Sequence, residues 1–355
     1  MSVEKLVKYI ILKTVVSVDN CELYFDIKLY YIKFNINQTN YLDRTMKNSD
    51  KGLHHITVLG GDGQRTTDFY VKTLGLRMVL KTVNQDDPST YHLFFANGNF
   101  QPASSITFFP WPMAVQGKPG TGEATVVSFS VPSESLPYWA ERFGRHGVDF
   151  NGPFTRFGKE VIGFQDPDRL NLELVFDDAV NTIDAWGDST VPAEHGIRGF
   201  WGTILKLSQT EGTGEILESV FGYQKSASEG NLELWSTGAS VGGSVIIEKA
   251  EHKPGVTGRG TVHHIAFRAG NDKEQEQMRS EIIKGYLNPS PVIDRHVFKS
   301  VYFQSPGGVL FEIATDGPGY QSAQSEEELG KKLFLPSWLE SRRDMIEKRL
   351  PEIVV

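Results

Sequence analysis

The stretch FQDPDRLNLELVFD at residues 164–177 aligns without a gap with FQSPGGVLFEIATD at residues 303–316. Both stretches contain Phe-Gln-x-Pro, an internal glutamate (Glu173 or Glu312) and a final aspartate. Each pattern predicts a strand, a tight turn at the proline and a second strand in which apolar and polar residues alternate. Two distant segments thus predict the same local structure, which indicates an internal repeat.

A second matched pair precedes these stretches, ATVVSFSV at residues 124–131 and TVHHIAFR at residues 261–268. Each is followed by a segment with the apolar spacing and the closing glycine of a helix, LPYWAERFGRHG in one case and DKEQEQMRSEIIKGY in the other. The repeating unit is therefore a strand, a helix and several further strands, spanning about 50 to 60 residues.

The same unit occurs twice more. One copy runs from GLHHITVLG (52–60) to SSITFFPWP (104–112), and the other runs from GFWGTILKL (199–207) to GSVIIEKA (243–250). Four β-α-β-β-β units cannot each bury a sheet face alone, so we expect an α+β fold in which they pair into two half-open barrels. The expected modules span residues 51–112, 123–180, 197–250 and 260–316, and a helical tail at 325–355 is expected to pack at a barrel mouth, as a cap or as a lid.

The first 45 residues differ from the rest of the chain. They are dense in Lys, Ile, Tyr and Asn and contain no Gly or Pro. Lys8 and Lys13 interrupt the apolar run, which predicts neither a transmembrane span nor a signal peptide. We expect that residues 1–45 are an extension from a mis-called start and that the working protein begins at Met46; an added strand or helical arm is the alternative.

The composition limits the partners and the location of the protein. The balance is acidic, with 36 Lys and Arg against 44 Asp and Glu, and the basic residues are scattered, which argues against nucleic acid and membrane surfaces as partners. Cys21 is the only cysteine, so neither a disulfide framework nor a thiolate metal cluster is expected. These features predict a cytoplasmic protein whose metal ligands are nitrogen and oxygen atoms. The sequence leaves open whether the chain forms a homo-oligomer.

The repeat, with its histidine and glutamate positions, resembles the vicinal-oxygen-chelate superfamily, which includes glyoxalase I, extradiol ring-cleaving dioxygenases and fosfomycin-resistance proteins. Within this superfamily the chain most resembles the hydroquinone-type ring-cleaving dioxygenases. The resemblance covers residues 50–355 and includes the tail LFLPSWLESRRDMIEKRLP.

The resemblance implies that metal-facing residues stand in the first and last strands of a module. The first module has His55 in its first strand but a phenylalanine of TFFPW in its last, whereas the fourth has both His264 and Glu312. Ser128 and Gly202 stand at the histidine places of the other two modules. If the first and fourth modules share a barrel, His55, His264 and Glu312 form one metal site.

The structural alternative is that these residues do not bind metal. A single His-His pair at the start of a strand is more often structural or exposed, and a lone glutamate in a strand is more often solvated. Two such pairs at equivalent places of a repeat favour metal binding instead. Two imidazoles and one carboxylate with open positions are typical of non-haem Fe(II) oxygenases, so Fe(II) is the expected metal, although Mn, Zn, Ni or Co accept the same ligands. Glu173 and Glu248, which lack histidine partners, are expected to be hydrogen-bonded or solvated.

The resemblance also implies catalytic roles around the metal. A histidine or tyrosine can accept or orient a phenolic proton, and a cationic side chain can stabilise negative charge developing on oxygen. Each residue has a structural interpretation as well, because the tyrosine in SVYFQSP can simply pack and the arginine in VIDRHVF can pair with Asp294 or with solvent. The five residues that match such positions are His54, Thr57, His263, Arg295 and Tyr302.

The expected function is therefore Fe(II)-dependent, extradiol-type cleavage of a hydroquinone-like or catechol-like ring, with a small aromatic diol and O2 as the partners. A glyoxalase-type lyase or isomerase is an alternative, and it would want a fourth protein ligand where the phenylalanine of TFFPW stands. A third alternative is a non-catalytic resistance protein that binds aromatic compounds, because a fold does not fix a function.

Overall fold

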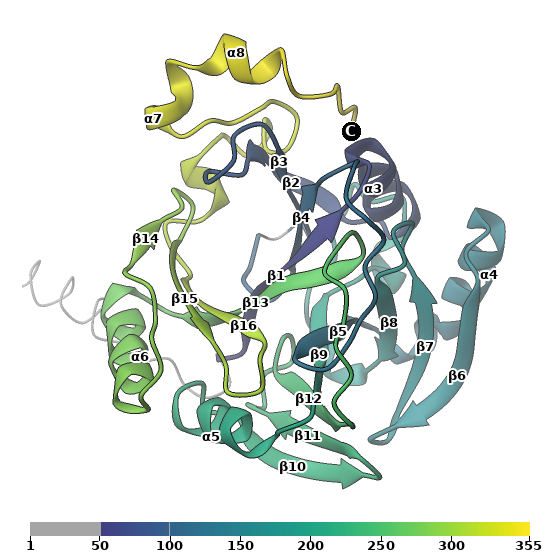
Figure 1. The fold of residues 1–355 in the computed structure, drawn as a ribbon. Coiled ribbons are helices and arrows are strands. Elements are labelled where there is room, and N and C mark those ends of the chain that lie inside the picture. The colour runs from purple at the N-terminus through teal and green to yellow at the C-terminus, as the bar shows by residue number, and fades with distance from the viewer. Residues whose placement is uncertain (1–50, 99) are drawn as a thin grey trace, which may run out of the picture. The chain divides into compact units, whose positions relative to one another are not determined.

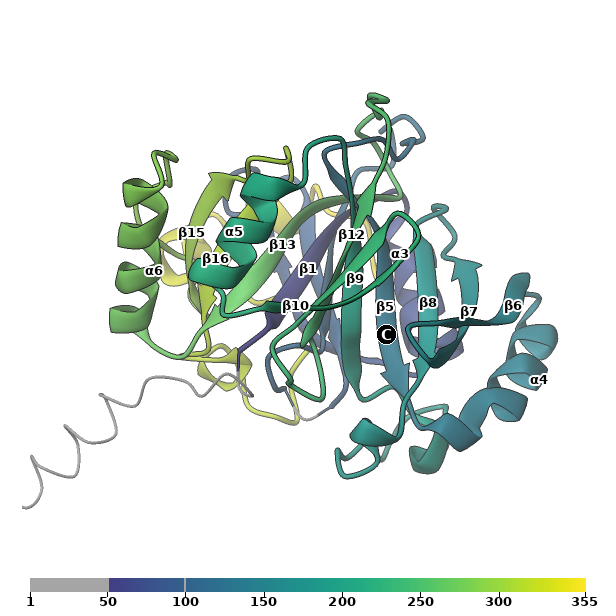
Figure 2. The same cartoon turned by 90° about the horizontal axis from the view of Figure 1, so that it is seen from below.

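The computed structural model describes residues 51–98 and 100–355. The expected extension at residues 1–45 lies outside the described residues. The described part contains two eight-stranded sheets, each curled into a half-open barrel (Figures 1 and 2). This architecture confirms the fold class predicted from the repeat.

The first sheet combines the first and fourth modules. Its strand order is β14-β15-β16-β13-β1-β4-β3-β2, so that segments from the two ends of the described chain share one barrel, as expected. The short β14 and the strand β2 form its two edges. Its strands are β1 Leu53–Gly60, β2 Arg77–Val83, β3 Tyr91–Ala96, β4 Ser105–Pro110, β13 Thr261–Ala269, β14 Ile293–Asp294, β15 Lys299–Gln304 and β16 Leu310–Thr315.

The second sheet combines the second and third modules in the order β10-β11-β12-β9-β5-β8-β7-β6. Its topology repeats that of the first sheet, with two antiparallel strands at the centre and a parallel pair on each side. Its strands are β5 Glu123–Val131, β6 Phe150–Arg156, β7 Lys159–Gln165, β8 Asn171–Phe176, β9 Gly199–Leu207, β10 Gln224–Glu229, β11 Leu232–Ser236 and β12 Ser244–Lys249.

Each module places its helix between its first and second strands, and local sequence signals end or begin these helices. One helix ends at Gly147, whose φ of 64° is a left-handed conformation that glycine adopts without strain. Another begins at Asn271, whose side chain accepts a hydrogen bond from the Glu274 backbone amide. The helices are α3 Gly63–Thr67 with a π-helical continuation at Asp68–Thr73, α4 Leu136–His146, α5 Glu211–Ser219, α6 Asp272–Lys284, α7 Ser337–Glu340 and α8 Arg343–Glu347, with 3-10 turns at Ser133–Ser135, Asp178–Val180, Ala193–His195 and Tyr320–Ser322.

The centre of the first sheet has approximate two-fold symmetry. Strands β1 and β13 run antiparallel with Ile56 opposite Ile265, and each pairs in parallel with the last strand of its own module. His55 and His264 are therefore equivalent positions in the two modules. Because they flank the same symmetry axis, the fold brings these two side chains together.

β-Bulges fix which side chains face the inside of the half-open barrel. The pairing of β1 with β13 shifts register at His54 and again at His263. A bulge adds one residue and interrupts the alternation of side chains. After the first bulge, Ile56 and Val58 belong to the large apolar core, which combines both sheets and the module helices. His55 alternates with them and therefore faces the opposite side of the sheet.

The tail packs along the free edge of β2 (Figure 1). Leu333 forms a parallel bridge with Lys81, and the backbone amide of Phe334 donates to the Lys81 carbonyl. Leu335, Leu339 and Ile346 of the tail are buried in a separate apolar cluster with Val83. The tail thereby covers a sheet edge that would otherwise expose unpaired backbone groups.

Candidate metal centre

Three buried side chains converge on the inner face of the first sheet. His55 comes from β1, His264 from β13 and Glu312 from β16, and all three are at most 3% exposed. Glu312 Oε2 lies 2.9 Å from His264 Nε2 and 3.3 Å from His55 Nε2, and the two Nε2 atoms lie 3.4 Å apart. The three atoms form a compact triangle.

This triangle fits a metal ion. With metal–ligand bonds of about 2.1 Å, two ligand atoms lie about 3.0 Å apart when the ligand–metal–ligand angle is a right angle. They lie about 3.4 Å apart when that angle is tetrahedral. The three observed separations lie close to this range. Glu312 is moreover fully buried, which is costly for an ionised carboxylate unless positive charge compensates it.

The protonation of the triangle also suits a cation. Burial by itself raises the pKa of Glu312, but the adjacent His55 and His264 outweigh burial and hold that pKa well below its usual range. Burial lowers the pKa of His264, which favours the neutral imidazole. Ser300 Oγ donates to the other carboxylate oxygen, Glu312 Oε1, at 2.5 Å and fixes its orientation. An ionised carboxylate at Glu312 and a neutral imidazole at His264 are the forms that bind metals.

His54 and His263 contact the metal-facing histidines from behind. His54 Nδ1 lies 2.9 Å from His55 Nδ1, and His263 Nδ1 lies 2.7 Å from His264 Nδ1. Burial lowers the pKa of His54 well below its usual range and that of His263 to about 4, so both imidazoles are neutral at neutral pH. A neutral outer imidazole can accept the Nδ1 proton of the inner one and leave its Nε2 free for metal. Neither outer histidine lines the pocket described next.

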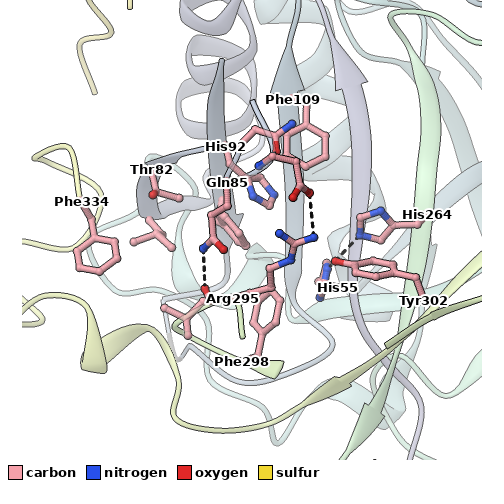
Figure 3. Close-up of a pocket in the computed structure, with 15 residues that line it drawn as sticks. His55, Thr82, Gln85, His92, Phe109, His264, Arg295, Phe298, Tyr302 and Phe334 are labelled. Atoms are coloured by element: carbon pink, nitrogen blue, oxygen red, sulfur yellow. Dashed lines mark hydrogen bonds and ion pairs between the residues drawn. The ribbon is translucent and has the colours of Figure 1, made fainter. Parts of the chain in front are cut away.

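A pocket opens over the triangle and holds two of the other expected residues. His55, His264, Arg295 and Tyr302 line it together, with their side chains directed toward one another (Figure 3). The Arg295 guanidinium carbon lies 5.6 Å from the centroid of the Tyr302 ring, and that ring packs edge-on against His264. Burial raises the pKa of Tyr302, so its hydroxyl remains protonated and can donate a hydrogen bond. Aromatic side chains, Phe298 among them, supply apolar walls.

Thr57, the remaining expected residue, does not line the pocket. Its Oγ1 lies 2.9 Å from Thr107 Oγ1, which in turn lies 2.8 Å from His92 Nε2. His92 does line the pocket, and burial lowers its pKa well below the usual range. Thr57 thus reaches the pocket only through two hydrogen-bonded neighbours.

Sequence reasoning missed several residues of this site, including His92, Ser300 and Asp86. His92 alternates with the core residue Leu93 in YHLFFAN, and this alternation could have placed it on the inner face. Asp86 lies in a loop, and no pattern in the sequence predicts its contact with Arg295 at 3.0 Å.

The register also corrects two alignments made from sequence. Thr57 pairs with Thr107, as Ala266 pairs with Glu312, so Thr107 and not a phenylalanine of TFFPW is the counterpart of Glu312. In the second sheet Ser128 pairs with Glu173, which makes Ser128 the counterpart of Ala266 rather than of a histidine. The segment between these paired residues is longer in the first module than in the fourth, so comparison of the sequences alone misplaced the counterpart of Glu312.

The second sheet has no such convergence of histidines in the described residues. Arg156 donates two hydrogen bonds to Glu173, at 2.9 and 2.5 Å, and Ser128 Oγ donates a third at 2.7 Å. Lys206 pairs with Glu248 at 2.9 Å. The expectation that Glu173 and Glu248 are hydrogen-bonded carboxylates is therefore confirmed. At Glu173 a guanidinium supplies the positive charge that a metal would supply in the first sheet.

Comparisons with known proteins agree with this fold. Residues 52–174 match the family model of the Glyoxalase/Bleomycin resistance protein/Dioxygenase superfamily. MhqE of Bacillus subtilis, provisionally named a ring-cleaving dioxygenase, is 41% identical over 303 residues, which cover 85% of this chain and 99% of MhqE. The chlorohydroquinone/hydroquinone 1,2-dioxygenase of Sphingobium indicum is 31% identical over 314 residues, which cover 86% of this chain and 97% of that protein.

A solved structure agrees as well. The crystal structure of a Bacillus subtilis protein, provisionally titled a dioxygenase, superposes with a TM-score of 0.83 and 37% identity, covering 87% of this chain and 99% of that one. Within residues 51–98 and 100–355, no helix is long and apolar enough to cross a membrane.

Proposed function

The chain belongs to the Glyoxalase/Bleomycin resistance protein/Dioxygenase superfamily, within its group of ring-cleaving dioxygenases, and on that premise we propose that it opens hydroquinone-like or catechol-like rings with dioxygen at an Fe(II) site. The observation that carries the proposal is the triangle of His55, His264 and Glu312, of which the two histidines line an aromatic-walled pocket. Two imidazoles and one carboxylate leave coordination positions open for other ligands, as ring cleavage requires.

Three protein ligands would hold the metal, and Fe(II) is the metal that we propose for them. When bound, it would bring a ring oxygen and dioxygen together and let electron density pass between them. Mn, Zn, Ni or Co can occupy the same ligands, so metal identity requires its own measurement.

The residues around the triangle supply binding and charge. The aromatic side chains of the pocket, Phe298 among them, can hold a planar ring. The protonated hydroxyl of Tyr302 can orient a substrate oxygen, and the neutral imidazole of His92 can accept a hydrogen bond from a ring hydroxyl. The positive charge of Arg295 can stabilise negative charge that develops on oxygen atoms inside the pocket.

A glyoxalase-type lyase or isomerase is the alternative enzyme. Such an enzyme would want a fourth protein ligand in the last strand of the first module. Thr107 occupies that place, and its hydroxyl is engaged by Thr57 and His92. The absence of a fourth ligand at Thr107 therefore argues against the lyase. A non-catalytic binding protein would not require the buried triangle, so the triangle argues against that alternative.

Oxygen uptake tests the proposal. Protein purified without oxygen and loaded with Fe(II) is mixed with hydroquinone or catechol, and with methylglyoxal plus glutathione as the lyase control. We expect stoichiometric oxygen uptake with a diol, lost in His264→Ala but retained in His252→Ala, whose side chain is exposed. Turnover of the glyoxalase substrate without oxygen, or diol-dependent uptake that survives His264→Ala, would contradict it.

The remaining expectations about partners and location stay predictions. The acidic composition argues against nucleic acid and membrane surfaces, and the single cysteine is consistent with the cytoplasm. Cell fractionation tests the location, and sedimentation of the purified protein tests whether it forms a homo-oligomer.

A further inference from the structure

The two edges of the first sheet meet beside the pocket. Arg295 directly follows the edge strand β14, whereas Gln85 and Asp86 belong to the loop that follows β2, the other edge. The Arg295 guanidinium donates to Asp86 Oδ2 at 3.0 Å, and Gln85 Nε2 donates to the Arg295 backbone oxygen at 3.1 Å. These two hydrogen bonds connect the open edges of the curled sheet over its inner face (Figure 3).

The two charged partners differ in their surroundings. Both line the pocket, but the Arg295 side chain is 17% exposed and the Asp86 side chain is 75% exposed. The guanidinium lies over the ring of Tyr302, close to His264. The positive charge is therefore held near the metal-facing residues, while its negative partner stands at the solvent side of the same pocket.

We propose that Asp86 makes this pocket selective for rings without an anionic substituent, because it occupies the guanidinium of Arg295. The inference rests on the proposed function, since it concerns which diols the same site accepts. A carboxylate on the ring could pair with Arg295 only by displacing Asp86 or by approaching a second negative charge.

The physical basis is competition between two anions for one cation. Arg295 has a planar guanidinium that binds carboxylates well, so alone it would favour acidic substrates. With Asp86 in place the pair is neutral, and an incoming carboxylate meets repulsion from Asp86 in addition to losing its water. An uncharged hydroquinone pays neither cost. Asp86 thus disfavours anionic rings by repulsion and does so without contacting His55, His264 or Glu312.

Asp86 could alternatively serve only to join the sheet edges. Such a structural role predicts that removing its charge weakens the binding of all diols equally. The proposed role predicts a change in the ratio between charged and uncharged diols. The ratio therefore separates the two roles, and Asp86→Glu should restore it because a longer carboxylate can still reach Arg295.

The experiment measures dissociation constants of the Fe(II)-loaded protein without oxygen, by calorimetry, for hydroquinone and for 2,5-dihydroxybenzoate. In Asp86→Asn we expect binding of the carboxylated diol to strengthen relative to hydroquinone by about fivefold, the upper range for partly exposed ion pairs. Asp86→Glu should keep the wild-type ratio. Asp272→Asn, which removes an exposed aspartate paired with Lys299, is the matched control and should also keep it. Arg295→Gln combined with Asp86→Asn should remove the gain.

The possible outcomes separate this inference from the proposed function. An unchanged ratio in Asp86→Asn overturns the inference, even where hydroquinone-dependent oxygen uptake is normal. A gain that persists in the double variant also overturns it, because Arg295 would not be the binding group. If diols bind but no oxygen is consumed, the proposed function fails while the binding ratios still decide the inference. If neither diol binds, both fail.

Discussion

His55 Nε2 and His264 Nε2 lie 3.4 Å apart although 209 positions separate the two residues in the sequence. The approximate two-fold relation between β1 and β13 produces this approach, since equivalent residues of two modules flank one axis. Glu312 breaks the symmetry, because its counterpart Thr107 has no carboxylate. One cluster therefore contains two equivalent imidazoles and a single carboxylate.

Metal binding should stabilise the folded protein. The triangle of acceptor atoms exists only in the folded state, so a metal at a hundred times its dissociation constant should add about 2.7 kcal/mol to the free energy of unfolding. Thermal unfolding with Fe(II), under exclusion of oxygen, and with excess chelator measures this difference. Glu312→Gln should lose the increment, whereas His252→Ala should keep it. If metal stabilised Glu312→Gln as much as the wild type, the metal would bind at a different site.

The outer histidines should set metal affinity. His54 and His263 accept hydrogen bonds from the inner imidazoles in the arrangement described above, so replacing either by phenylalanine should weaken metal binding about tenfold to a hundredfold. His263→Asn, which keeps an acceptor, should lose less. Competition between the protein and a chelator of known affinity measures the effect, and the metal-free melting temperature controls for folding. Unchanged affinity in both phenylalanine variants would show that these contacts do not orient the ligands.

Stability should fall with rising pH because of Asp166. Burial raises the pKa of this carboxyl to about 7, whereas it is about 3.9 in an unfolded chain. Between these two pKa values, Asp166 is protonated in the folded state but ionised in the unfolded state. The stabilisation is thus complete below about pH 4 and declines, by at most about 1.4 kcal/mol per pH unit, until about pH 7.

The variant Asp166→Asn tests this pH dependence. Its amide oxygen can still accept from the backbone amides of Asp168 and Leu170, and its NH2 group can donate to the hydroxyl of Tyr70. Urea unfolding at pH 5, 6, 7 and 8 should show a flatter profile than that of the wild type. Asp188→Asn, at an exposed aspartate, should reproduce the wild-type slope. Parallel profiles for all three proteins would exclude Asp166 as the titrating group.

The sequence contained enough information to predict the fold and the three residues that converge on the inner face of the first sheet. The repeat recurs with its strand periodicity and its turn residues, and these are local properties of the chain. His55, His264 and Glu312 could be selected because the repeat marked equivalent strands and the resemblance indicated which positions in those strands to choose. Arg295 and Tyr302 likewise lie in the pocket where the resemblance suggested.

The tertiary structure alone decided the register and the contacts between modules. Two bulges turned His54 and His263 behind His55 and His264. The pairing of the first and last strands made Thr107, rather than a phenylalanine, the counterpart of Glu312. The chain between the first and last strands is longer in the first module than in the fourth, and a gap-free alignment cannot register that difference. The contact between Asp86 and Arg295 depends on the curl of a whole eight-stranded sheet. That curl is the sum of small twists between neighbouring strands, so neither of the two short segments predicts the contact by itself.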